Sequence, residues 1–75
     1  MTEKQYRDYW REIEVGWTDK QVRALLGGPD KVEPIETGIV VWTYGIWPLA
    51  GKITFKDNQV VGIKLPLFNI IYWNR

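Results

Sequence analysis

The chain of 75 residues is predicted to form one small α+β domain, in which two N-terminal helices pack on one face of a three- to four-stranded antiparallel sheet. Up to about residue 26, apolar residues recur at the spacing of a helix face. After Pro29 they alternate at the spacing of a strand. Helices followed by an antiparallel meander favour a layer of helices on one face of the sheet.

The first predicted helix spans about residues 3–14. Thr2 stands three residues before Gln5, which is the spacing of a capping box, and Gly16 ends the helix. Its apolar face is formed at positions i, i+3, i+4 and i+7 by Tyr6, Tyr9, Trp10 and Ile13. The opposite face mixes charges of both signs, as is typical of a solvated helix surface.

The second predicted helix spans about residues 19–26. Thr18 and Gln21 repeat the capping spacing at its start. Its apolar stripe is formed by Val22, Leu25 and Leu26. The Gly-Gly-Pro sequence at 27–29 supplies a C-terminal turn and prevents the helix from continuing.

Three strands are predicted from alternating runs that are rich in β-branched and aromatic residues. They lie at about 39–45, 52–56 and 60–65. The Asp-Asn pair at 57–58 is expected to form a two-residue hairpin turn, because both residues tolerate positive φ. Residues 31–36 could add a fourth strand, which Pro34 restricts to the edge of the sheet.

Each predicted strand has two faces, and only one of them can meet the helices. Ile53 and Phe55 point to one side, and Thr54 and Lys56 point to the other. The face without helices is free to meet water or a protein. A register error of one residue exchanges the faces, so the sequence leaves open which face is which.

The composition argues against most catalytic and metal chemistry. The chain contains no His and no Cys, so we expect no zinc site, no disulfide, no cofactor and a non-catalytic role. Asp30, Glu33 and Glu36 lie close in the sequence, and a small carboxylate-based enzyme or ligand-binding domain is the alternative. Solvation explains these three better, because they fall on a loop and an edge strand.

The charge balance and the hydropathy pattern exclude further classes. Ten basic against nine acidic residues lack the basic excess of a nucleic-acid-binding protein. No apolar run reaches the about 18 residues that a membrane-spanning helix needs. The N-terminus resembles no signal peptide and there is no Cys for lipid attachment. As written, the chain is expected to be cytoplasmic, or periplasmic if an export signal has been removed.

Apolar residues outside the predicted core indicate a protein-binding surface. The loop at 45–51 carries Trp47 and Leu49, which could be interface anchors or could fold back over the core. The tail at 67–75 is apolar on both of its predicted faces, with Phe68 and Tyr72 on one and Trp73 on the other. It could form an edge strand, cover the open sheet face, or make a homodimer or partner contact.

These residues lead to one functional expectation, a module that binds another protein through the open sheet face, the aromatic loop and the tail. The candidate partner-binding residues are Trp42, Trp47, Leu49, Phe68, Tyr72 and Trp73. Trp42 belongs to the core instead if the other sheet face is the open one.

Several short motifs occur in the order and spacing of a known domain. They are Val15-Gly16-Trp17-Thr18, Val22, Leu25-Leu26-Gly27-Gly28-Pro29-Asp30, Trp42-x-Tyr44, Ile53-x-Phe55 and Val60-Val61. Over about residues 13–65 the chain resembles the SmpA/OmlA (BamE-like) domain family of bacterial outer-membrane assembly. The resemblance implies a non-enzymatic domain of two helices on an antiparallel sheet, used as an assembly or scaffold subunit.

A more distant likeness is to the repeat units of β-lactamase inhibitor protein. These units have a similar helix–helix–sheet order and bind an enzyme through an aromatic-rich sheet surface. This likeness implies the alternative use, a small inhibitor that blocks a target enzyme and is encoded by a phage or mobile element.

Overall fold

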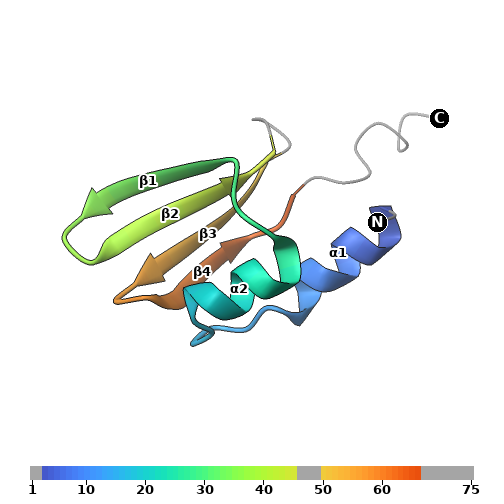
Figure 1. Ribbon diagram of the computed structural model, residues 1–75, viewed down its shortest axis with the longest axis horizontal. Helices are drawn as coiled ribbons and strands as arrows, with labels where there is room; N and C mark the ends of the chain where they lie inside the picture. Colours follow the sequence, from blue (N-terminus) through green and yellow to red (C-terminus); the bar gives the residue numbers. More distant parts are fainter. Residues whose placement is uncertain (1–2, 46–49, 67–75) are drawn as a thin grey trace.

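The computed structural model describes residues 3–45 and 50–66. Two helices come first, α1 (Glu3–Glu12) and α2 (Asp19–Leu26). Four strands follow: β1 (Lys31–Glu36), β2 (Ile39–Tyr44), β3 (Gly51–Lys56) and β4 (Gln59–Lys64). Each strand pairs antiparallel with the next, in the order β1-β2-β3-β4 (Figure 1). The predicted α+β fold, with helices ahead of an antiparallel meander, is confirmed.

The first helix ends at Glu12, two residues earlier than predicted. The N–H of Ile13 donates to the carbonyl of Trp10, only three residues back, at 3.4 Å. The N–H of Gly16 then donates to the carbonyl of Val60 in β4 at 2.8 Å. This long-range bond satisfies a backbone group that a continued helix would otherwise use, so the chain turns toward the sheet.

The second helix has the predicted bounds and the predicted cap. The N–H of Gln21 donates to Thr18 Oγ1 at 3.3 Å, and the N–H of Thr18 donates to Gln21 Oε1 at 2.8 Å. Both bonds of a capping box are therefore present. At the other end, Gly27 has a φ of 83° and its N–H donates to the carbonyl of Arg23 at 2.9 Å.

The strands differ from the predicted bounds by one residue, and residues 31–36 do form the fourth strand. β1 lies at the sheet edge, where Pro34 is tolerated, and its register with β2 shifts between Pro34 and Glu36. Asp57 and Asn58 have φ values of 51° and 66°, as a type I′ hairpin turn requires.

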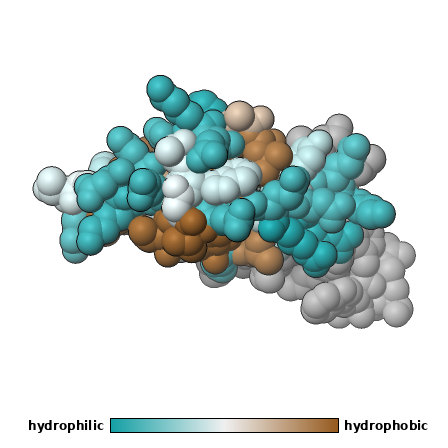
Figure 2. Space-filling view, turned by 90° about the horizontal axis from the view of Figure 1, so that it is seen from below, coloured by the Kyte–Doolittle hydropathy of each residue, from teal (hydrophilic) through white to brown (hydrophobic). Residues whose placement is uncertain are grey.

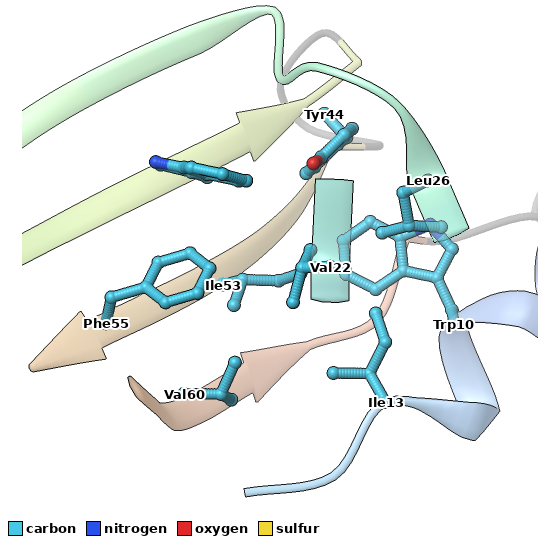
Figure 3. Close-up of a cluster of buried hydrophobic side chains, with 9 residues drawn as sticks. Trp10, Ile13, Val22, Leu26, Tyr44, Ile53, Phe55 and Val60 are labelled. Atoms are coloured by element: carbon cyan, nitrogen blue, oxygen red, sulfur yellow. The ribbon is translucent and has the colours of Figure 1, made fainter. Parts of the chain in front are cut away.

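The core lies between the helices and one face of the sheet, and Figure 3 shows side chains from both helices meeting those of the strands. Its buried members are Trp10, Ile13, Val22, Leu26, Trp42, Tyr44, Ile53, Phe55 and Val60. The Trp10 and Tyr44 rings meet edge to face, with centroids 5.5 Å apart. Each buried aromatic side chain removes about 150–250 Å² from water, so these rings dominate the packing.

Trp10 packs on β3 at a place where the strand has no side chain. An added Cβ at Gly51 would lie 2.7 Å from Cη2 of Trp10 and 2.6 Å from Cγ of Pro66. Neither distance is tolerable, so this glycine is required by the close approach of the ring.

Tyr44 joins the sheet to the end of α2. Its hydroxyl donates a hydrogen bond to the carbonyl of Gly27 at 2.8 Å. Burial raises the pKa of Tyr44 to about 12, with a smaller contribution from nearby Tyr6, and Arg23 opposes the shift. Burial disfavours the charged phenolate, so Tyr44 keeps the proton that it donates to the Gly27 carbonyl.

Candidate protein-binding surface

The sheet face that points away from the helices carries side chains in rows that cross the strands, because directly paired residues share a face. One row contains Lys31, Thr43, Lys52 and Lys64. The next contains Glu33, Val41, Thr54 and Gly62, and the third contains Glu36, Ile39, Lys56 and Gln59. We call these residues together the open face, and the row with Lys31, Lys52 and Lys64 the basic row. Thr43, in the basic row, is itself buried.

The basic row brings like charges together. Lys52 and Lys64 are directly opposite each other on β3 and β4. Lys31 forms an ion pair with Glu33, with 3.5 Å between Nζ and Oε2. Within residues 3–45 and 50–66, Lys52 and Lys64 form no ion pair. Like charges that face each other across two strands destabilise a sheet, so this pair has a cost.

A shallow hollow of about 350 Å³ lies in the open face beside the basic row. Its lining residues are Glu33, Ile35, Val41, Lys52, Thr54, Gly62, Ile63 and Lys64. Gly62 does not have a positive φ. An added Cβ at this position would meet Thr54 Cβ at 3.6 Å, which is ordinary contact. The backbone and its neighbours therefore do not require glycine here, yet its missing side chain keeps the hollow open.

A second hollow of about 350 Å³ lies on the helix side, near the ends of the two hairpins. It is lined by Asp19, Gly38, Val40, Trp42, Phe55, Asp57 and Asn58. Trp42 and Phe55 are 6% and 3% exposed, so they offer little surface to a ligand. This hollow has an acidic rim, whereas lysines flank the hollow of the open face.

Trp42 is buried, so the expectation that it anchors a partner on the open face is corrected. It pairs with Ile53 and therefore faces the helices. The centroid of the Trp42 ring lies 4.7 Å from that of Phe55. The guanidinium carbon of Arg23 lies 5.0 Å from the same Trp42 centroid. The other five candidate residues lie outside the described part of the chain: Trp47, Leu49, Phe68, Tyr72 and Trp73.

The three carboxylates that could have formed a reactive site are separated. Asp30 Oδ2 accepts a hydrogen bond from the N–H of Gly45 at 2.6 Å, at one end of β1. Glu33 is paired with Lys31, and Glu36 lies at the other end of β1. Across the described residues, no group of three or more His, Cys, Asp or Glu is placed to hold a metal ion.

Sequence reasoning missed the residues that now define the surface. Lys52, Lys64 and Gly62 were not among the candidate partner-binding residues. The alternation of Ile53 and Thr54 identifies which side chains share a face of β3. It does not identify the residue of β4 with which each of them pairs. The signal lies in the register, which places Lys52 opposite Lys64.

Seen from below the view of Figure 1, the surface is mostly hydrophilic, with apolar side chains gathered in one part of it (Figure 2). Exposed apolar residues near the β4 edge of the sheet include Val15 and Val61.

In the part of the chain described, neither helix has the length and apolar character needed to cross a membrane. Comparison with protein-family models, with curated proteins and with solved structures finds no significant match.

Proposed function

We propose that the chain is a non-catalytic module that binds another protein through the open face of its sheet. The observation that carries the proposal is the difference between the two faces. One face fills the core with apolar side chains, whereas the other places half-buried Val41 and Ile39 among charged residues. An apolar centre with a polar, charged rim is the composition of a non-obligate protein interface.

The chemistry of the side chains supports binding rather than catalysis. The chain has no His and no Cys, the residues on which most acid–base and nucleophilic sites depend. Asp30 and Glu33 already have structural partners in Gly45 and Lys31. The resemblance to the SmpA/OmlA family supports the same proposal, because it implies an assembly subunit. An enzyme inhibitor would act by the same means.

The aromatic loop and the tail extend the proposed surface. The loop joins β2 to β3 and therefore starts next to Thr43 and Lys52, and the tail follows shortly after Lys64. Both segments thus leave the sheet at the end that carries the basic row. In this proposal Trp47 and Leu49 of the loop, and the tail aromatics, add anchor residues to the charged face.

Photo-crosslinking in cells that encode the chain tests this proposal. A photoreactive amino acid replaces Thr54 on the open face, and the matched control replaces exposed Lys20 on α2. We expect a discrete protein adduct from position 54 that is absent from position 20. Adding Gly62→Trp, which fills the hollow, should abolish the adduct. Equal labelling at the two positions, or no protein adduct from position 54, would contradict the proposal.

A further inference from the structure

We propose that the open face binds an acidic segment of its partner protein, which the basic row holds and which lies over Gly62. This inference rests on the proposed protein-binding function and adds the chemistry of the partner. Two independent features of the open face support it, a pair of like charges and a glycine. Folding does not explain the like charges, and no positive φ requires the glycine, which lies beside a shift in the register of β3 and β4.

The pair of like charges is the first feature. Lys52 and Lys64 face each other across β3 and β4, and among the described residues neither has an acidic partner. The pair opposes folding, because directly opposite like charges destabilise a sheet. A carboxylate placed between the two ammonium groups would remove that repulsion and would gain from both charges. This part of the sheet is thus prepared for a negative charge that no ion pair among residues 3–45 and 50–66 supplies.

Gly62 is the second feature. A glycine in a strand interior weakens the strand, and it is expected at a β-bulge, where the backbone needs positive φ, or where another group comes close. The register of β3 and β4 shifts beside the Thr54–Gly62 pair, but Gly62 has no positive φ. At Gly51 the close group is known, because Trp10 occupies the space that a Cβ would take. At Gly62 an added Cβ would make only ordinary contact, the nearest with Thr54 Cβ at 3.6 Å. In this proposal a group from outside the domain lies over Gly62, as Trp10 lies over Gly51.

The two features lie in the same place. Lys64 follows Gly62 by two residues on β4, and their neighbours Lys52 and Thr54 are equally spaced on β3. All four residues line the hollow of about 350 Å³. One ligand can therefore contact the lysines and cover the glycine at once.

The rest of the open face favours a protein segment over a nucleic acid. Glu33 and Glu36 lie on β1, on the same face as the lysines. Together they would repel the uniformly charged phosphate backbone of a nucleic acid. Ile35 and Val41 also line the hollow and can contact apolar side chains of the partner. A segment with carboxylates over β3 and β4 and apolar residues nearer β1 matches this distribution.

Selection from a random peptide library, displayed against the folded chain, tests the inference. We expect the selected peptides to contain an excess of Asp and Glu and to bind more weakly as salt increases. Affinity for a selected peptide should fall about two- to fivefold in Lys52→Gln and again in Lys64→Gln. Lys20→Gln removes the same charge from α2 and should leave affinity unchanged. Gly62→Val should weaken binding most, and Gly62→Ala replaces it if the larger side chain impairs folding.

The outcomes separate this inference from the proposed function. Peptides without acidic excess, which lose affinity in the Gly62 variant but not in the lysine variants, would overturn the acidic segment and leave protein binding intact. A library that yields no peptide dependent on Gly62 would overturn both proposals. A short oligothymidylate that binds this face more tightly than the selected peptides would overturn the inference in favour of a nucleic acid.

Discussion

The helix-covered face and the open face belong to the same four strands, but different physical requirements explain their residues. On the covered face, folding explains the details: Gly51 makes room for Trp10, and Tyr44 donates to the end of α2. On the open face, the Lys52–Lys64 pair opposes folding, and neither positive φ nor a close contact requires Gly62, which lies beside a shift in the register of β3 and β4. In a small domain, residues that lower the stability and that no packing or backbone requirement explains are the best guide to function.

The largest effect is expected from Trp10→Ala, since this side chain of α1 packs on the covered face. Trp10 is 1% exposed and contacts Tyr44, so its removal leaves a cavity in the core. The expected loss is about 3–5 kcal/mol of unfolding free energy. Net stability of small domains starts at about 5 kcal/mol, so much of the protein should unfold. Urea denaturation followed by circular dichroism measures the loss. Val15→Ala, at a residue that is 70% exposed, should change stability by less than about 0.5 kcal/mol.

A smaller effect is expected from Gly51→Ala on the same face. The added Cβ would come within 2.8 Å of Trp10 and Pro66, so the ring and the strand must move apart. Overpacking of this kind costs about 1–3 kcal/mol. Thermal and urea denaturation measure the change. A variant as stable as the original chain would show that Trp10 can shift freely, and the covered face would then be less constrained than we argue.

Tyr44→Phe removes a single hydrogen bond from the covered face. The bond to the Gly27 carbonyl is 2.8 Å long and partly buried. Its loss should cost about 0.5–1.5 kcal/mol. Wild-type and variant chains are compared in urea at neutral pH. An unchanged urea midpoint would mean that water bonds the Gly27 carbonyl as well as the Tyr44 hydroxyl does.

The same residue gives a pH dependence. The pKa of Tyr44 is raised to about 12 by burial, above the value of about 10 for a free tyrosine. Its stabilising contribution is complete below pH 10, because the folded and unfolded states are then both protonated. As the pH rises from about 10 to about 12, the unfolded chain loses its proton first and stability falls. The difference in stability between wild type and Tyr44→Phe should therefore shrink over this range.

The fold was predictable wherever short-range chemistry decides it. The capping box of Thr18 and Gln21 and the turn at Asp57 and Asn58 use residues that are near in sequence, and both were predicted correctly. The end of α1 was wrong by two residues. Its position depends on the bond from Gly16 to Val60, a contact between distant parts of the chain that local patterns do not contain.

The candidate surface was harder to predict than the fold. Aromatic residues were chosen because they are enriched in interfaces, but Trp42 is used by the core. The open face shows its character only through the pairing of strands, since Lys52 and Lys64 are separated in sequence and meet by register. Binary patterning assigns side chains to faces, whereas cross-strand pairing decides which charges are neighbours.

The smallest effect is expected on the open face, from Gly62→Ala, and its sign distinguishes the two faces. The nearest atom to the new Cβ is Thr54 Cβ at 3.6 Å, and the backbone has no positive φ to strain. Alanine also restricts the unfolded chain more than glycine does, so the variant should be neutral to more stable by up to about 1 kcal/mol. Urea denaturation beside Gly51→Ala makes a matched comparison, with the same substitution on neighbouring strands. A loss as large as that of Gly51→Ala would mean that folding requires both glycines, and Gly62 would no longer indicate a binding partner.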